Sequence, residues 1–292
     1  MQKLKAITKI GIITKQSNEH YQDVIKELAK YLKKQKKEVF FDQNSYKYFP
    51  NEKPHKKEEL LNNVDLVIVL GGDGTLLKTA RNTTRKKTLI LGVNLGTLGF
   101  LSECKPDQLY ECIDKIFAGQ YVVDKRTLLR ITVYRNHKKI ESFLALNDAV
   151  INQGSFARLI QLDVELDARK IVNFKADGVI ISTPTGSTGH SLSAGGPIVH
   201  PNLQTIMVTP ICPSSLSMRP IILPDTRQLT VTIDTNRKEA TNTIGLTIDG
   251  QDVVSLEYGD KIKFRRSKRC FYLVRTKNKY YKMLRTKLNW GA

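Results

Sequence analysis

The first hundred residues alternate short apolar runs with amphipathic segments. Apolar runs predict buried strands at residues 10–14, 39–41, 64–70 and 89–93. Apolar side chains at helical spacing predict a helix over residues 21–32, and two further helices are expected from about Thr75 and over residues 107–117. The run at 64–70 is almost continuously apolar, as is typical of a parallel strand covered on both faces. The alternation therefore predicts an open, parallel, Rossmann-like α/β sheet with helices on both sides.

The pattern changes after about Tyr121, where short β-rich segments replace the alternation of strands and helices. The β-rich segments lie at residues 128–134, 143–146, 159–166 and 229–233. Turn residues follow two of these segments, at 135–137 and 167–169, and a further turn lies at 249–250. The last part of the chain begins with a strand at 271–275 and ends in a basic, helix-like tail. We expect an α/β domain over residues 1–120, a β-rich, sandwich-like domain over 121–264, and a C-terminal segment over 265–292.

The length and the charge of the chain limit its class. With 292 residues the chain is long for one hydrophobic core and short for three, which agrees with two domains. The net charge is +19, and twelve basic residues but no acidic one lie between Lys261 and Ala292. Such an excess attracts nucleotides, nucleic acids or acidic membranes, but solvated basic faces explain it equally well. Charge alone does not identify a partner.

The cysteines and the N-terminus favour a cytoplasmic protein without a membrane anchor. The sequence contains four scattered cysteines, at Cys104, Cys112, Cys212 and Cys270. They form no CxxC pair and no zinc-like spacing with histidine, so we expect reduced thiols. The basic N-terminus has no signal-peptide core because Thr8 and Lys9 interrupt it. No apolar stretch approaches the roughly 20 residues that are needed to cross a bilayer.

A buried strand leads into Gly71-Gly72-Asp73-Gly74-Thr75 and then into the start of a helix. Glycines let a backbone approach a phosphate closely, and the N–H groups at a helix start attract anions. Gly71, Gly72, Gly74 and Thr75 are therefore candidate phosphate-binding residues. A carboxylate in such a turn would repel phosphate unless Asp73 accepts a proton from an attacking hydroxyl, holds Mg²⁺, or does both. The competing interpretation is a type I′ Asp-Gly turn between strands, which the following helix disfavours.

Two common phosphate-binding motifs do not occur in the sequence. There is no G-x-x-x-x-G-K-[ST] segment, which excludes a P-loop enzyme. The stretch from Gly92 to Gly99 only approximates G-x-G-x-x-G, because its first two glycines are one residue too far apart. This stretch also follows a strand, so we expect it to line the same cleft as the turn around Asp73.

Two further polar segments offer hydrogen-bonding groups to a ligand. A strand ending near Ser182 leads into a loop over residues 183–196 that is dense in hydroxyls and glycines. Hydroxyl groups suit ribose, adenine edges or phosphate oxygens, although a surface loop with a helix cap at Ser187 or Thr188 has the same composition. Asn147-Asp148 lies between apolar β segments, where a ligand or a plain turn would satisfy its polar groups.

Together these segments resemble the bacterial type of NAD kinase. The family is marked by a GGDG turn, an Asn-acidic pair, a hydroxyl-rich loop and an Asp-Gly-Gln segment. Here these are Gly71–Gly74, Asn147-Asp148, Thr183–Gly196 and Asp249-Gly250-Gln251. They occur in the family's order over nearly the whole chain. The GGDG turn alone is shared with diacylglycerol-type lipid kinases and phosphofructokinases, whereas the hydroxyl loop is far more specific.

The resemblance implies transfer of the γ-phosphoryl group of ATP to the 2′-hydroxyl of the adenosine ribose of NAD. Asp73 would be the general base, Mg²⁺ would accompany ATP, and Asn147 and Asp148 would contact ribose. The other substrate-binding residues that the resemblance implies are Gly74, Arg158, Lys175, Asp177, Thr188, Gly189, His190, Ser191, Leu192, Ser193 and Gln251. It also implies that the C-terminal segment returns to the first domain and that the protein is a homotetramer or homodimer, with a neighbouring subunit helping to complete the site.

The sequence departs from the family pattern at two places. Where the family commonly has alanine and tyrosine after the hydroxyl loop, this chain has Gly189-His190. An imidazole stacks on adenosine less well than a phenol ring. Where the family often has a histidine, this chain has the segment Pro213–Ser217, with Ser214 and Ser215. Both departures affect adenosine contacts and leave the phosphoryl chemistry intact.

Two other functions compete with this one. A lipid kinase would share the glycine turn and bring its basic tail to anionic membranes, but it does not explain the loop over 183–196. A nucleic-acid-binding protein would explain the charge, but its only candidate aromatics among basic residues are Phe271-Tyr272 and Tyr280-Tyr281. We therefore expect NAD and ATP as substrates, with neither nucleic acid nor a membrane as partner.

Overall fold

The chain divides into two compact units, which are described separately. The computed structural model describes residues 6–16, 21–97, 99–154, 159–234, 244–277 and 279–291. The first unit takes in Met1–Lys125 and Cys270–Ala292, and the second takes in Arg126–Arg269. The last residues of the chain therefore belong to the same unit as the first, which agrees with the expected return of the C-terminal segment.

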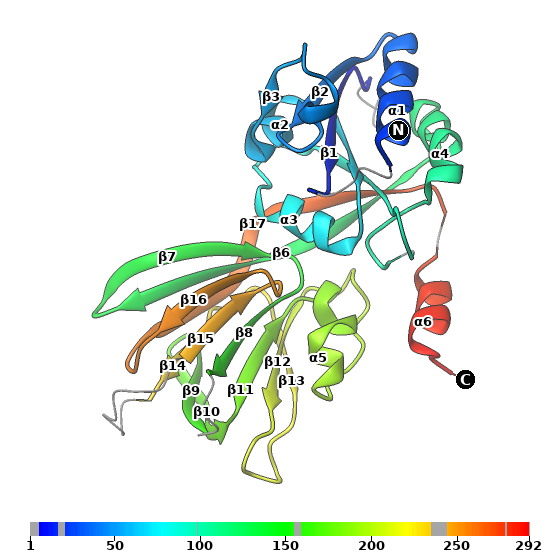
Figure 1. Ribbon diagram of the computed structural model, residues 1–292. Coiled ribbons are helices and arrows are strands. Elements are labelled where there is room, and N and C mark those ends of the chain that lie inside the picture. The colour runs from blue at the N-terminus through cyan, green and yellow to red at the C-terminus, as the bar shows by residue number, and fades with distance from the viewer. Residues whose placement is uncertain are drawn as a thin grey trace. The chain divides into compact units, whose positions relative to one another are not determined.

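The sheet of the first unit is parallel, with strand order β17-β5-β4-β1-β2-β3 (Figure 1). Its strands are β1 (Lys9–Thr14), β2 (Glu38–Asp42), β3 (Pro54–His55), β4 (Leu66–Leu70), β5 (Leu89–Val93) and the last residues of β17 (Lys261–Arg275). Strand β4 is buried at every position, as its continuous apolar run predicts.

Helices cover both faces of this sheet, as the predicted α/β architecture requires. They are α1 (Gln22–Lys34), α2 (Lys57–Asn63), α3 (Asp73–Arg81) and α4 (Leu109–Phe117), whereas α6 (Tyr280–Leu288) follows β17 at the end of the chain. Helices α1 and α4 share one core with alternate residues of β1, β4 and β5. On the opposite face, Gly11 of β1 lies against Leu60 of α2, and Gly92 of β5 lies against Leu76 of α3. Both glycines give a helix room to pack closely on the sheet.

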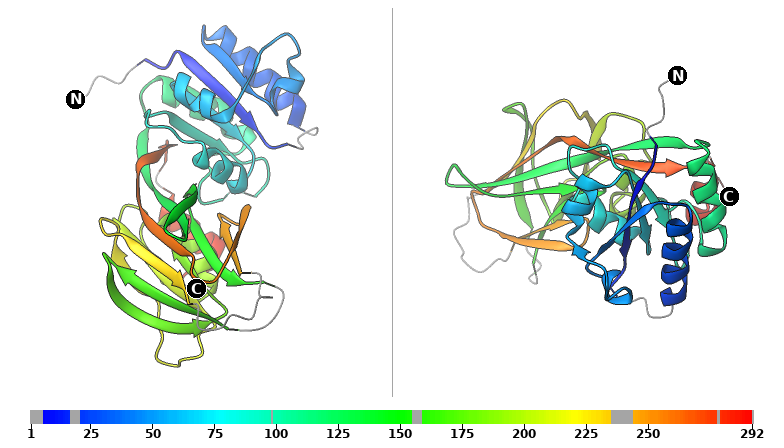
Figure 2. Two further views of the ribbon diagram at one scale, coloured as in Figure 1. Left: turned by 90° about the vertical axis from the view of Figure 1, so that its left-hand side faces the viewer. Right: turned by 90° about the horizontal axis from the view of Figure 1, so that it is seen from above.

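The second unit is a sandwich of two sheets around one core (Figure 2). One sheet has the order β13-β12-β11-β8-β15-β16; the other has the order β10-β9-β14-β17, with β6 pairing β17 and β7. The strands are β6 (Val122–Arg135), β7 (Lys138–Ala145), β8 (Asp148–Gln153), β9 (Ile160–Leu166), β10 (Arg169–Ala176), β11 (Gly178–Ser182), β12 (Thr205–Ile211), β13 (Ile221–Pro224), β14 (Leu229–Ile233), β15 (Ile244–Ile248) and β16 (Asp252–Leu256). Ile131 and Val231 of one sheet and Ile151 and Leu246 of the other belong to the same buried cluster.

Two details of the sequence prediction need correction. The helix expected over residues 107–117 begins at Leu109, because Pro106–Gln108 form a 3-10 turn before it. The competing interpretation of Asp73-Gly74 as a type I′ hairpin turn is wrong, because Asp73 is the first residue of α3. The turn therefore has the strand-to-helix geometry that an anion site requires.

Candidate active site

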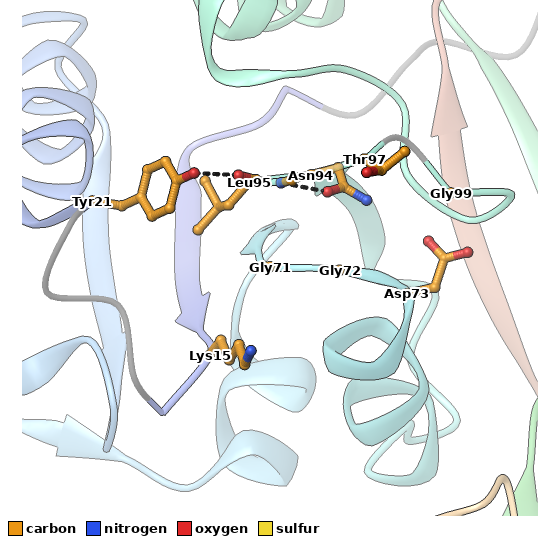
Figure 3. A pocket seen from close by; sticks show the side chains of 10 residues that line it. Lys15, Tyr21, Gly71, Gly72, Asp73, Asn94, Leu95, Thr97 and Gly99 are labelled. Atoms are coloured by element: carbon orange, nitrogen blue, oxygen red, sulfur yellow. Dashed lines mark hydrogen bonds between the residues drawn. The ribbon is translucent and has the colours of Figure 1, made fainter.

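A cavity of about 500 Å³ lies in the first unit at the carboxyl ends of β1, β4 and β5 (Figure 3). Its lining residues are Lys15, Tyr21, Gly71, Gly72, Asp73, Asn94, Leu95, Gly96, Thr97 and Gly99. The carboxyl edge of an open parallel sheet is where ligands bind in such folds. The structure thus brings the turn around Asp73 and the stretch after β5 to one cavity.

The start of α3 presents backbone donors to this cavity. Gly72 is the N-cap, in an extended conformation, and no side chain caps the helix. The N–H groups of Gly72 and Asp73 donate to no other described residue, whereas the N–H of Gly71 donates to the carbonyl of Val93. A Cβ at Gly71 would overlap with the side chain of Thr75, so the turn requires glycine there. Thr75 is buried beneath the turn and supports it.

The Asp73 carboxylate is held by three donors from the segment that follows β5. Oδ2 accepts from the backbone N–H groups of Phe100 and Leu101, at 2.9 and 3.3 Å, and Oδ1 accepts from the Ser102 hydroxyl at 3.0 Å. A Cβ at Gly99 would overlap with the same carboxylate, so the segment approaches Asp73 closely because residue 99 is glycine. Donors of this kind hold the carboxylate in one orientation.

In the second unit, a buried carboxylate organises the Asn147-Asp148 turn. The Asp249 side chain accepts from the N–H groups of Leu146, Asn147 and Asp148, at 3.0, 2.8 and 3.1 Å. Asp148 is 5% exposed. Burial, with a smaller contribution from the Asp249 charge, raises the pKa of Asp148 to about 7. Gln251 follows Asp249 in the turn between β15 and β16, so the structure gathers both motifs at one end of β8.

The hydroxyl-rich loop lies at the same end of β8 and packs against the Asn147 turn. The Thr183 N–H donates to the Asn147 carbonyl at 2.8 Å, and a Cβ at Gly186 would overlap with that carbonyl. Ser187 and Ser191 are fully buried, and their hydroxyls bond to backbone groups of Pro184 and Val199 and to Thr209. These two hydroxyls therefore hold the loop together. Thr188, Gly189 and Leu192 are half-buried, and His190 and Ser193 are exposed.

Lys175 and Asp177 lie at the opposite end of β8 from Asn147. Strand β11 pairs with β8 so that Ser182 faces Asp148 and Gly178 faces Asn152. Asp177 accepts from the Gln153 amide at 2.9 Å. Gln153 lies five positions after Asp148 along β8, which corresponds to about 17 Å. One copy of the second unit therefore does not bring Lys175 and Asp177 to the other candidate residues, and Arg158 lies outside the described residues.

Three residues at these sites were not predicted from the sequence. Lys15 lines the cavity because β1 ends beside β4, where its N–H donates to the carbonyl of Leu70. Asp249 was expected in a turn and in the family's Asp-Gly-Gln segment but not as the acceptor that holds the Asn147 turn, and Ser102 was not singled out. Their contacts join residues far apart in the chain, so no local pattern signals them.

The described residues contain no preformed metal centre and no membrane helix. No group of three or more His, Cys, Asp or Glu side chains among them is arranged to hold a metal ion. No helix in the described ranges is long and apolar enough to cross a membrane.

Known families match both parts of the chain. Residues 10–121 match the ATP-NAD kinase N-terminal domain, and residues 146–276 match the ATP-NAD kinase C-terminal domain. A NAD kinase of Geotalea daltonii is 40% identical over 284 residues, which cover 97% of this chain and 99% of the relative. A NAD kinase of Geobacter sulfurreducens is 46% identical over 228 residues, 78% of this chain and 79% of the relative.

Solved structures show the same fold. A yeast NADH kinase in complex with NADH has a TM-score of 0.88 and 27% identity, covering 99% of this chain and 89% of that chain. A NAD kinase from Archaeoglobus fulgidus in complex with ATP has a TM-score of 0.72, covering 97% of this chain and 99% of that chain. At 24% identity the second likeness shows the fold alone. These findings give no support to the lipid-kinase alternative.

Proposed function

The chain belongs to the ATP-NAD kinase family, and on that premise we propose that it transfers the γ-phosphoryl group of ATP to the 2′-hydroxyl of the adenosine ribose of NAD, with Asp73 as the general base. The observation that carries the role of Asp73 is its carboxylate, fixed by three donors at the edge of a cavity built for anions. Phosphoryl transfer needs mainly positioning and charge neutralisation, which such a site supplies.

The reaction divides among the residues of the chain as follows. The 2′-hydroxyl oxygen forms the bond to the γ-phosphorus while the bond from that phosphorus to the leaving oxygen of ADP breaks. The proton of the hydroxyl passes to Asp73. The N–H groups of Gly72 and Asp73, with the Lys15 ammonium, bind the phosphate oxygens. Asn147 and Asp148 bind ribose hydroxyls, and the surface of the loop around Thr188 and His190 receives the adenosine.

A magnesium ion bound with ATP fits this cavity. Asp73 is the one carboxylate among its described lining residues, and Mg²⁺ characteristically takes one or two carboxylates together with phosphate oxygens and water. The ion would neutralise the charge of the triphosphate. The side-chain oxygens of Asp73 and Asn94 are the groups of this chain that would hold it.

We also propose a homo-oligomer that works in the cytoplasm. The placement of Asp177 beside Gln153, which lies about 17 Å from Asp148 along β8, supports a site that a second copy helps to complete. Four free cysteines support a reducing compartment.

The assay for this function is NADP formation from ATP, Mg²⁺ and NAD, with diacylglycerol as the competing acceptor. The decisive variant is Asp73→Asn. Its amide can keep the present contacts, because the oxygen accepts from both N–H groups and the NH₂ group donates to Ser102. We expect turnover to fall by about 10²- to 10⁴-fold with NAD affinity within a few fold.

Asp107→Asn, at an exposed position of the same unit, is the matched control and should keep wild-type turnover. Product with diacylglycerol but none with NAD would overturn the proposed reaction. Near wild-type turnover of Asp73→Asn would overturn the role of Asp73 as base.

A further inference from the structure

Arg275 closes β17 in the first unit and is largely buried, with a side chain 17% exposed. In the sequence it is one of twelve basic residues of the C-terminal stretch, to which the proposed reaction gives no role. The structure distinguishes it from the solvated members of that stretch. Its guanidinium contacts two carboxylates and a row of backbone carbonyls.

The guanidinium binds three consecutive carbonyls of the segment after β5. Nη2 donates to Phe100 at 3.0 Å, and Nη1 donates to both Leu101 and Ser102 at 3.1 Å. In addition, Nε donates to Asp124 at 3.1 Å, and Nη1 lies 3.6 Å from Glu103. The two carboxylates offset the Arg275 charge, so its effect on the segment is to fix geometry.

The same three residues hold the Asp73 carboxylate from the opposite side. The N–H groups of Phe100 and Leu101 and the hydroxyl of Ser102 all donate to it. The Phe100 carbonyl and the Leu101 N–H belong to one peptide unit. That peptide therefore accepts from Arg275 at its oxygen and donates to Asp73 at its nitrogen, and hydrogen bonds in such a chain polarise and strengthen one another.

We propose that Arg275 is a positioning residue for phosphoryl transfer, which fixes the 100–102 segment so that its three donors orient the Asp73 carboxylate. This inference rests on the proposed role of Asp73 as the base. Arg275 binds carbonyls and carboxylates and has no part in substrate contact. Lysine cannot replace it, because an ammonium lacks the planar fork that reaches several acceptors at fixed angles.

The test compares Arg275→Lys with the wild type in steady-state NADP formation. We expect kcat to fall by about 10- to 100-fold, as a small displacement of a catalytic group does, with KM for NAD and for ATP within about threefold. Arg135→Lys is the matched control. Arg135 also bridges carboxylates, Asp260 and Glu257, with a side chain 29% exposed, but it lies in the second unit. Its replacement should lower the melting temperature and leave kcat within about twofold of wild type.

A second measurement separates positioning from a merely structural role. If Arg275 acts through Asp73, then Arg275→Lys should change the residual rate of Asp73→Asn by less than about twofold, because coupled residues are not additive. Independent, multiplicative losses in the double variant would overturn the inference. So would an Arg275→Lys enzyme with wild-type kcat, or one in which only KM changes.

Asp124→Asn provides a variant that retains the Arg275 side chain but loosens the hold on its guanidinium. It weakens the acceptor of Nε and should lower kcat by about threefold or more at unchanged KM. If Arg275→Lys does not fold, wild-type kcat in Asp124→Asn would overturn the inference. Near wild-type turnover of Asp73→Asn would instead contradict the role of Asp73 as the base. Failure of the Arg275 inference can therefore be distinguished from failure of the proposed function.

Discussion

At the scale of the residue, the buried carboxyl group of Asp148 links stability to pH. Burial and the nearby Asp249 charge raise its pKa to about 7. The unfolded chain releases this proton near pH 4, so between about pH 4 and 7 the folded state binds more protons and stability falls as pH rises. The full penalty, of order 4 kcal/mol, is present above pH 7. A ribose hydroxyl that donates to the carboxylate would offset part of it.

Asp148→Asn should therefore stabilise the free protein most strongly at alkaline pH. We expect its thermal midpoint to be close to that of the wild type at pH 4 and several degrees higher at pH 8, because an amide carries no charge to desolvate. Asp107→Asn, which removes an exposed carboxylate, should show no such divergence. A difference between Asp148→Asn and wild type that stays constant from pH 4 to 8 would contradict this account.

Which individual residues are predictable depends on how local their contacts are. The glycines around Asp73 and the pair Asn147-Asp148 stand out because they interrupt apolar strands. The residues that hold them do not stand out. Asp249 is separated by more than 100 residues from the N–H groups it binds, and Arg275 by 173 to 175 residues from its carbonyls. Only the folded chain brings these groups together.

At the scale of the element, the predictable features are those with a short-range cause. The turn residues Asn136 and His137 both adopt positive φ between β6 and β7, as do Asp249 and Gly250 between β15 and β16. Their residue types favour that conformation locally. Helix α2 escaped prediction because it spans seven residues and buries only Leu60 and Leu61, too little for a periodic signal.

The close contact between α3 and the segment after β5 predicts that one methyl group added at residue 99 strongly lowers kcat. A Cβ at residue 99 would overlap with the Asp73 carboxylate. We expect Gly99→Ala to displace the carboxylate and lower kcat by about 10²-fold, with a small change in melting temperature.

Gly245→Ala is the matched control for this substitution. Its Cβ would lie 3.4 Å from the Asn152 side chain, an ordinary contact on β15 of the second unit. Steady-state kinetics and thermal melts of both variants distinguish the two positions. Equal kcat values for Gly99→Ala and wild type would show that the carboxylate can move without loss of function.

At the scale of the whole molecule, the predicted fold class is confirmed, whereas the exact limits of the units lie within strands that continue from one unit into the other. An α/β unit and a sandwich follow from the change of hydrophobic pattern near Tyr121, and the family matches agree. The units change at 125/126 and 269/270, about five residues beyond the predicted limits. Those positions lie within β6 and β17, which continue through both limits. A strand without a break carries no sequence signal of a boundary.

The placement of Lys175 and Asp177 leads to a prediction about the assembly. If these residues complete the site of a neighbouring copy, then each site takes Asp73 from one copy and Asp177 from the other. Asp73→Asn and Asp177→Ala therefore remove groups that different copies supply to the same site. Each variant alone should be nearly inactive.

Co-refolding equal amounts of the two variants should restore activity, because a mixed pair contains one site with both residues intact. Random assembly of dimers would return about a quarter of wild-type turnover. Mixing the folded variants without refolding is the control for simple addition of their residual rates. Mixed oligomers, shown by mass measurements, whose activity equals only that sum would contradict the prediction. Asp177 would then contribute to the site of its own copy, and one copy's site would span the length of β8.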